Sequence, residues 1–271
     1  MAKKWTKSEE DRYGSELRTL YISQNKTISE VGLILNIAPQ TVFSRLHRLG
    51  IPTCREKKLF VNNQRKDIIL PKTRSATLAE LLGVLLGDGH ISHFQVIITL
   101  GSKELKYAHH VSSLLKNVFG KKPKISVRST GYRDVYLGST AITSWLMREG
   151  LVSNKVEDQV DAPLWIFKKR EYMIAFLRGF FDTDGSIYKL KYGIQLSFTN
   201  KSLPLLYSLQ KMLRALGYAA SAMSAYRVYV TRVSEVERFF REIKPANAKH
   251  QRRFSEFIRR VGTQAVNEDA L

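Results

Sequence analysis

Cysteine is nearly absent from this sequence, which has Cys54 as its single thiol among 271 residues. One cysteine excludes an internal disulfide framework and any zinc site built from several thiolates. Long apolar runs are missing as well, since no stretch approaches the ~18 residues of a membrane-spanning helix. The opening residues MAKKWTKSEEDRY lack the apolar segment of a signal peptide. These absences predict a cytoplasmic or organellar protein with no secretion signal and no membrane partner.

Acidic residues are the second shortage. The chain has 24 Asp and Glu against 44 Lys and Arg, which leaves a formal net charge of +20. The excess is spread along the chain, because residues 1–75 hold 15 basic and 7 acidic residues and residues 76–271 hold 29 and 17. A hydrophobic fraction of 44% excludes disorder throughout. A folded chain with this charge attracts polyanions, of which nucleic acid is the commonest, and we expect both parts to contact it.

The first segment, residues 1–51, has the pattern of a small all-α domain. Residues 8–23 predict a helix with acidic residues in its first turn. Two shorter helices follow: Thr27 can cap the first, and Pro39 starts the second, which ends at Gly50. Apolar residues line one face of the last helix, and its other face presents Gln40, Thr41, Ser44, Arg45, His47 and Arg48.

This pattern resembles the helix-turn-helix of DNA-binding proteins, with residues 39–49 as the recognition helix. The resemblance implies that the polar residues of this helix contact phosphates or base edges. A plain αα-hairpin whose polar residues face water is the alternative. Residues 52–75 have two prolines and a basic excess, which predict a linker that is either solvated or follows the phosphate backbone.

The remaining sequence contains an internal repeat. LLGVLLGDGHI at residues 81–91 aligns with LRGFFDTDGSI at residues 177–187, 96 residues later. The identical pairs are Leu81/Leu177, Gly83/Gly179, Asp88/Asp184, Gly89/Gly185 and Ile91/Ile187. Because the similarity extends into the segments that follow, each half predicts the element order αββαββα. The expected fold class is therefore α+β, with one half over residues 76–160 and the other over residues 161–271.

The two motifs resemble the paired signature helices of LAGLIDADG homing endonucleases, in the single-chain form with two pseudosymmetric halves. One apolar helix ending in Asp-Gly occurs by chance, but two at this separation, each followed by matching strands, are specific. The resemblance covers residues 78–260. It implies a monomer whose paired sheets form a saddle over double-stranded DNA with a long, specific target site. It also implies cleavage of both strands with Mg²⁺ or another divalent cation.

Some relatives in that family are transcription regulators or RNA maturases without cleavage activity, and an added helix-turn-helix suits such a binder. The presence of both Asp88 and Asp184 favours the nuclease, because a pure binder gains nothing from a costly pair of anions. Many relatives lie inside inteins, whereas this chain begins at Met1 and ends NEDAL, without splice residues. We therefore expect a free-standing protein that acts on the DNA of a nucleoid or an organelle, and an intron is a better fit for its gene than an intein; the sequence leaves open whether an intron encodes it.

The physics of the repeat predicts a metal site. Gly83 and Gly179 let the two helices approach closely, which brings Asp88 and Asp184 together. Adjacent carboxylates at helix C-termini repel each other unless a cation binds between them, and hard oxygen ligands suit Mg²⁺. The resemblance adds as ligands the backbone carbonyls of Gly87 and Thr183.

Further candidates for catalysis come from the resemblance. Ser102 and Asn200 occupy matched positions where the family often has a polar, water-orienting residue. The candidates for transition-state charge are Lys103, Lys201 and Arg232. Arg232 has Ser139 as its first-half counterpart, a departure that predicts unequal cleavage of the two DNA strands, because a hydroxyl stabilises negative charge less than a guanidinium does.

Alternating residues of the predicted strands would read the major groove, although a shift of one residue in register would exchange the two faces. The DNA-binding candidates are Gln95, Arg128 and Arg133 in the first half and Lys191, Gln195 and Arg227 in the second. The same faces are expected to hold His93, Ile97, Thr99, Ser126, Tyr188, Ser197 and Tyr229. Each of these side chains is alternatively a phosphate contact or a solvated residue.

Three further groups have structural interpretations. Asp182, whose first-half counterpart is Leu86, is expected to solvate the end of its helix. The residues expected in the core are Trp145, Trp165 and Phe176. The histidines His90, His93, His109 and His110 have neither the spacing nor the cysteine partners of a zinc site, so no zinc is expected.

Overall fold

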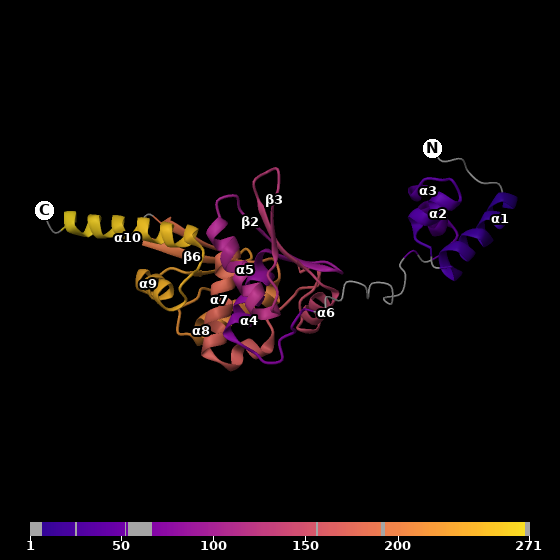
Figure 1. Ribbon diagram of the computed structural model, residues 1–271. Helices are drawn as coiled ribbons and strands as arrows, with labels where there is room; N and C mark the ends of the chain where they lie inside the picture. Colours follow the sequence, from indigo (N-terminus) through magenta and orange to yellow (C-terminus); the bar gives the residue numbers. More distant parts are fainter. Residues whose placement is uncertain are drawn as a thin grey trace. The chain divides into compact units, whose positions relative to one another are not determined.

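The computed structural model describes residues 7–24, 26–51, 53, 67–155, 157–190 and 193–268. The chain divides into two compact units, Met1–Asn62 and Asn63–Leu271, which Figure 1 shows with their labelled elements. Among the described residues, no helix is long and apolar enough to cross a membrane. Each unit has a hydrophobic core of its own, so each is described by itself.

The first unit is a small helical domain. Helix α1 (Lys7–Arg18) continues into a single π-helical turn, η1 (Thr19–Ser23), and α2 (Ile28–Ile34) and α3 (Pro39–Arg48) follow. The predicted cap at Thr27 is present and forms a capping box with Glu30. Asn36, at φ 50°, makes the turn between α2 and α3. The core consists of Leu17, Leu20, Tyr21, Val31, Val42, Leu46 and Ile51.

The first half of the second unit has the predicted element order. Helix α4 (Ala76–Asp88) leads into β1 (Gly89–Ile91) and β2 (Gln95–Leu100), then α5 (Leu105–Phe119), β3 (Lys124–Val127), β4 (Arg133–Gly138) and α6 (Thr140–Arg148). The four strands form one antiparallel sheet in the order β1-β2-β4-β3. The α+β fold class is confirmed.

Among the described residues, the second half departs from the predicted order by one strand fewer and one further helix, α10. After η3 (Leu164–Lys168) come α7 (Arg170–Asp184), β5 (Gly185–Leu190), β6 (Gly193–Thr199), α8 (Leu203–Ala215), β7 (Arg227–Val230), α9 (Val233–Glu242) and α10 (Ala248–Glu268). The described residues form a three-stranded sheet, β5-β6-β7. The strand expected before β7 does not form a regular ladder, because Tyr229 N–H donates to the hydroxyl of Ser221 at 3.0 Å instead of to a backbone carbonyl.

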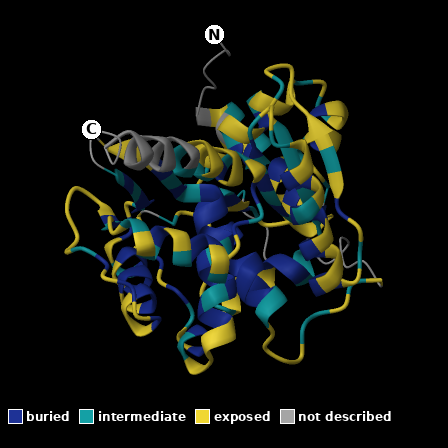
Figure 2. Cartoon of the chain, turned by 90° about the vertical axis from the view of Figure 1, so that its left-hand side faces the viewer, coloured by how far each residue is buried: buried dark blue, intermediate teal, exposed yellow. Residues whose placement is uncertain are grey.

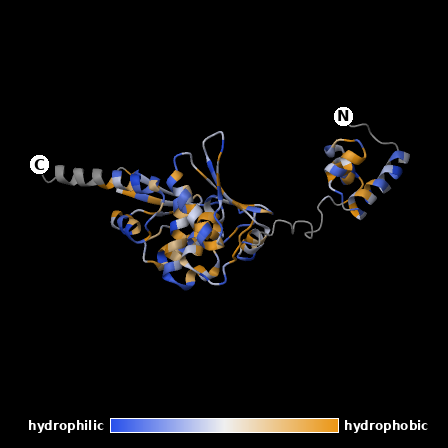
Figure 3. Cartoon of the chain, viewed as in Figure 1, coloured by the Kyte–Doolittle hydropathy of each residue, from blue (hydrophilic) through white to orange (hydrophobic). Residues whose placement is uncertain are grey.

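Helices α4 and α7 pack against each other at the centre of this unit. A Cβ atom on Gly83 would clash with the carbonyl of Phe176 and lie 2.8 Å from Phe180 N, and one on Gly179 would clash with the carbonyl of Glu80. Glycine is therefore what allows the two backbones to touch. Buried residues gather on the interior helices in Figure 2, and Figure 3 shows apolar residues concentrated there. The predicted core residues Trp145, Trp165 and Phe176 are buried.

The prediction that residues 52–75 form a linker is wrong for its second part. Ile69 N–H donates to the Phe119 carbonyl at 3.0 Å, and Asp67 pairs with Lys121. Ser75 caps α4 by accepting the N–H of Leu78 at 3.1 Å. Residues 67–75 thus belong to the first half, held by backbone and ionic contacts that their weak periodicity did not indicate. Residues 54–66 lie outside the described residues.

Candidate functional site

The site forms where α4 and α7 end side by side. Asp88 and Asp184 are the last residues of the two helices. A Cβ atom on Gly87 would overlap the Thr183 hydroxyl and lie 3.6 Å from the carboxyl carbon of Asp184. The Thr183 hydroxyl is turned into its own helix, where it donates to the Phe180 carbonyl at 2.9 Å. The four residues predicted to hold a metal are therefore brought together.

The environment of both aspartates disfavours their charged forms. Burial raises the pKa of Asp184 to about 6, and the nearby Asp88 carboxylate contributes to the increase. Burial also raises the pKa of Asp88. The amide of Asn200 donates to Asp184 Oδ2 at 3.2 Å, so this predicted catalytic residue contacts its aspartate directly. Such a pair of carboxylates is stabilised when positive charge comes near.

Lys155 supplies one such charge. Its ammonium donates to the carbonyls of Leu85 and Leu86, both at 3.3 Å, and to the carbonyl of Gly87. Burial lowers the pKa of Lys155, while Asp184 and Asp88 oppose that shift. A cation thus already lies on the carbonyl that was predicted to bind metal. Carboxylates and carbonyls in this arrangement are the donors that Mg²⁺ accepts, so the residues present fit a divalent cation.

Lys249 supplies a second charge from another direction. Its ammonium lies 2.9 Å from Glu104 Oε1. Its positive charge opposes the burial that raises the pKa of Asp88, but does not cancel it. Burial opposes ionisation of Glu104, but hydrogen bonds from Asn247 and Lys249 hold its pKa below the ordinary value. A cleft of about 590 Å³ opens beside this pair, and its lining includes Ser102, Lys103, Lys106, Tyr132, Lys249 and Arg252. Two predicted residues, Ser102 and Lys103, therefore lie near Lys249.

The sequence around both helix ends is similar to that of a known family. A family model described as LAGLIDADG-like domain matches residues 75–157 and 171–244, which is more than half of the chain and includes both helix ends. The chain belongs to the LAGLIDADG-like family. Its match to the replication factor C small subunit of Methanocaldococcus jannaschii is 34% identical over 128 residues, or 46% of this chain. The chain spans only 7% of that curated relative's length.

Two solved structures illustrate similar chains. Full-length DUF199/WhiA from Thermatoga maritima is 18% identical, with a TM-score of 0.48, and the similarity covers 72% of this chain and 63% of that one. The homing endonuclease I-DmoI in complex with DNA and Mn is 19% identical, with a TM-score of 0.45 and coverage of 62% and 96%. Since both scores lie below 0.5, membership rests on the family match.

Sequence reasoning missed the two lysines at the LAGLIDADG helix ends. Lys155 follows the last helix of the first half, 67 residues after Asp88, and Lys249 follows α9 of the second half, 65 residues after Asp184. This near-equal spacing is a signal that a self-alignment of the sequence contains. It is weak because the surrounding segments, SNKVEDQV and PANAKHQRR, share few residues. Lys106 was missed at the start of α5, where its second-half counterpart is Pro204.

Arg232 lies away from the aspartate end of its strand. Strand register pairs Gly185, next to Asp184, with Phe198, and Phe198 with Val228. Arg232 lies four residues beyond Val228, about 13 Å along the chain at ~3.3 Å per residue, and pairs with Glu235 at 3.7 Å. Its counterpart Ser139 is buried and caps α6. Both residues precede the helix after the last strand, as aligned, but neither lies at the aspartate end of that strand.

The outer faces of the two sheets carry most of the predicted DNA-reading residues. In β2, residues Gln95, Ile97 and Thr99 alternate with buried neighbours, and Gln195 does so in β6. In β7, Arg227 and Tyr229 occupy the corresponding face. This agrees with the predicted register. Lys191 lies outside the described residues, and Lys201 is exposed next to Asn200.

Two arginines of the first sheet differ from expectation. Arg133 has the same strand parity as the buried residues Val135 and Leu137, so it does not share the predicted outer face, and it donates to the carbonyl of Ser102. Arg128 is on the outer side but is already bonded to both carboxylate oxygens of Asp134, at 2.7 and 2.8 Å. The short-range alternation in the sequence could not show either contact, because both join segments through tertiary structure.

In the first unit, the polar face of α3 is only partly available. Gln40, Ser44 and Arg48 are exposed, whereas Thr41 and Arg45 are half-buried. Ser44 donates its hydroxyl proton to the Gln40 carbonyl at 2.9 Å.

Asp182 has a structural role, as expected, but it does not solvate its helix end, because its side chain is 0% exposed and accepts the N–H groups of Ala246 and Asn247. His110, one of the four histidines, bonds Glu80 at 2.6 Å. No metal-binding cluster of three or more His, Cys, Asp or Glu exists within the described ranges.

Proposed function

We propose that the chain is a site-specific endonuclease that cleaves both strands of double-stranded DNA with the help of a divalent cation. The observation that carries the proposal is the contact between the ends of α4 and α7, which places Asp88 and Asp184 together with raised pKa values. A protein that only binds DNA has no use for this costly pair of carboxylates. As a single chain supplies both halves, a monomer suffices.

The residues around the pair have separable roles in this proposal. Asp88, Asp184 and the carbonyls of Gly87 and Thr183 hold the cation, with Mg²⁺ as the expected ion. When bound, it supplies positive charge that polarises the phosphate and activates water. Asn200 holds Asp184 through its amide and can orient water with the rest of its polar group. Lys249, at the edge of the basic cleft, stabilises the negative charge that develops on the phosphate.

Lys155 has a different role, because it occupies the Gly87 carbonyl. Before a cation binds, the Lys155 ammonium reduces the electrostatic repulsion between the two carboxylates. When the cation binds, the ammonium must leave the Gly87 carbonyl. Lys106, in the cleft with Lys249, adds charge on the first-half side. The outer sheet faces, with Gln95, Gln195 and Arg227, would contact DNA in the major groove, where side chains can reach base edges. The protein would act wherever this target DNA lies, in a nucleoid or an organelle.

The test is cleavage of a supercoiled plasmid that carries the target DNA. This target is made by joining directly the two stretches of host DNA that flank the gene. With Mg²⁺ we expect nicked and then linear product, and with EDTA neither. If the protein binds this DNA but none of Mg²⁺, Mn²⁺ and Ca²⁺ supports nicking, the proposal is overturned. The alternative, a DNA-binding regulator or RNA maturase, would then remain.

The raised pKa of Asp184 predicts how stability depends on pH when no cation is present. Because its pKa of about 6 in the folded state exceeds the ordinary value of 3.8, the folded protein binds the proton more tightly. Its contribution to stability is therefore present below about pH 4 and is lost as pH rises through 6, by at most about 3 kcal/mol. Asp184→Asn should remove this part of the slope. Melting curves in EDTA from pH 4 to 8 test it, and parallel profiles for variant and parent would contradict it.

We further propose that the helical unit extends the DNA contact. Deleting residues 1–62, which hold 11 basic and 6 acidic residues, should lower DNA affinity by at least about tenfold. The plot of log affinity against log salt should become shallower by about 0.9 for each phosphate that the shortened protein no longer neutralises. Titration at several salt concentrations measures both. Glu16→Gln, on the exposed part of α1, is the control and should not weaken binding; an unchanged salt slope after deletion would show that the unit does not touch DNA.

A further inference from the structure

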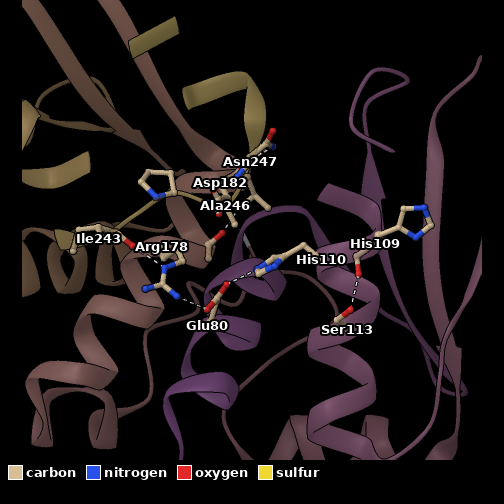
Figure 4. A network of polar contacts seen from close by, with 12 residues as sticks. Glu80, His109, His110, Ser113, Arg178, Asp182, Ile243, Ala246 and Asn247 are labelled. Carbon is tan, nitrogen blue, oxygen red and sulfur yellow. Dashed lines mark hydrogen bonds and ion pairs between the residues drawn. The ribbon is translucent and has the colours of Figure 1, made fainter. Parts of the chain in front are cut away.

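A buried aspartate ties the chain after α9 to the end of α7. Asp182 accepts the N–H of Ala246 at 2.8 Å and the N–H of Asn247 at 3.0 Å, one on each carboxylate oxygen. Its side chain is 0% exposed, so these two bonds replace all of its contact with water. Figure 4 shows the carboxylate pointing at this segment from the last turn of α7. Asp182 of α7 therefore fixes the segment that leads into α10.

A second anchor holds the start of the same segment. Arg178, one turn before Asp182 on α7, donates to the Ile243 carbonyl at 2.7 Å and to Glu80 of α4 at 3.0 Å. Glu80 lies between Arg178 and His110 in Figure 4, and His110 bonds its other oxygen at 2.6 Å. Residues 243–247 are therefore fixed at both ends to the central helix pair.

Asn247 connects this anchored segment to Lys249 through hydrogen bonds. Its amide donates to the Asp182 carbonyl at 3.0 Å and to Glu104 at 2.6 Å, and its side-chain oxygen accepts the N–H of Lys249 at 3.1 Å. Glu104 in turn pairs with the Lys249 ammonium at 2.9 Å. Since Asn247 is 1% exposed, neither water nor another rotamer competes easily for these bonds. Both the backbone and the charge of Lys249 are held by this network.

We infer that Asp182 and Asn247 are positioning residues that aim the Lys249 ammonium at Asp88 and the phosphate beside it, an inference that rests on the proposed function. The two halves differ in this device. The position of Asp182 is taken by Leu86 in the first half, and Lys155 lies on the carbonyls of α4 instead. A lysine on a flexible four-carbon stem needs such support, because a misplacement of about 1 Å in a catalytic group can cost about 100-fold in rate.

A double-mutant cycle tests the inference with Asp182→Asn, Lys249→Met and the double variant. An amide at position 182 keeps the shape but cannot accept both backbone N–H groups. Single-turnover cleavage with each strand labelled should slow by about 10- to 100-fold on one strand in Asp182→Asn, and more in Lys249→Met. The double variant should be no slower than Lys249→Met alone, since Asp182 acts through the lysine. Lys116→Met, an exposed lysine of α5, is the matched control and should cleave as the parent does.

Two further measurements separate the outcomes. Hydrogen exchange should show faster exchange at Ala246, Asn247 and Lys249 in Asp182→Asn, with DNA affinity retained. The melting temperature should fall, because one buried N–H loses its acceptor, so cleavage is compared well below the melting temperature of the variant. Glu104→Gln keeps one oxygen as the acceptor for Asn247 but lacks the charge for Lys249 and the acceptor for the Gly101 N–H. It should slow cleavage without faster exchange at Ala246 and Asn247. Equal slowing by Asp182→Asn in the parent and in Lys249→Met, or unchanged exchange, would overturn the inference. Absence of cleavage by the parent would overturn the proposed function instead, and the exchange result would still decide whether Asp182 positions this segment.

Discussion

Replacing either Asp88 or Asp184 with Asn is expected to abolish double-strand cleavage and to leave DNA binding intact. Each carboxylate supplies one of the two negative side chains at the junction of α4 and α7, and an amide cannot provide the charge that holds a divalent cation. Loss of several kcal/mol of transition-state stabilisation corresponds to a fall in rate of about 10³-fold or more. Plasmid cleavage and a gel-shift titration in Ca²⁺ measure the two properties.

The same variants should behave in the opposite direction in a stability measurement. Without a cation, removing one of two buried carboxylates relieves repulsion, so the free energy of unfolding at pH 7 should rise in EDTA. Asp161→Asn, on an exposed loop where its Oδ1 accepts the N–H of Ala162, is the control that should change neither cleavage nor melting. Undiminished cleavage by Asp88→Asn or Asp184→Asn would remove these residues from the active site.

Adding one methyl group at Gly83 or Gly179 is expected to destabilise the second unit severely. In each case the new Cβ would collide with a backbone carbonyl of the partner helix, Phe176 or Glu80, which cannot move without separating the helices. Overpacking typically costs about 1–3 kcal/mol, and a clash with backbone belongs at or above the upper end. We expect Gly83→Ala and Gly179→Ala to lose cleavage together with stability, because the Asp88–Asp184 junction depends on the same close approach.

Thermal or urea unfolding of the parent and the two variants measures this loss. Gly14→Ala is the control: it lies in α1, and its nearest neighbour, Leu49, would be at an ordinary 3.7 Å. Alanine there should be neutral or slightly stabilising, because helix interiors favour alanine over glycine. Unfolding curves for Gly83→Ala that coincide with the parent's would show that α4 and α7 can separate at little cost.

Much of the architecture followed from patterns within short stretches. The capping residue Thr27, Pro39 at the start of α3 and the apolar helices ending in Asp88 and Asp184 act locally, through hydrogen bonds and side-chain periodicity, and these elements formed as expected. The alternation in β2 predicted the correct outer face. Where local bonding was irregular, as at Ser221 before β7, the expected strand was absent.

The site itself was predicted in part. Repetition at a fixed spacing indicated the aspartate pair, and the matched position of Asn200 led to a residue that contacts Asp184. By contrast, Arg232 follows the end of β7 that lies away from Asp184, and a linear alignment does not say which end of a strand faces the aspartates. Arg128, read as a DNA contact, is bonded to Asp134 and Thr99 through pairing between strands.

The repeated motif alone was enough to indicate the family, the two-half organisation and the pair of carboxylates, because it encodes one helix packing against another. Which cations serve that pair depends on the folded chain. Lys155 and Lys249 lie 67 and 65 residues after Asp88 and Asp184 in the chain, and only the folded protein brings Lys155 to the Gly87 carbonyl and Lys249 to Glu104. Asp182 is buried and not solvated because it bonds Ala246 and Asn247, which lie 64 and 65 residues away in the chain and contact it only in the folded protein. Local pattern fixes secondary structure and the faces that become buried, whereas burial, charge pairing and pKa depend on contacts between segments distant in sequence.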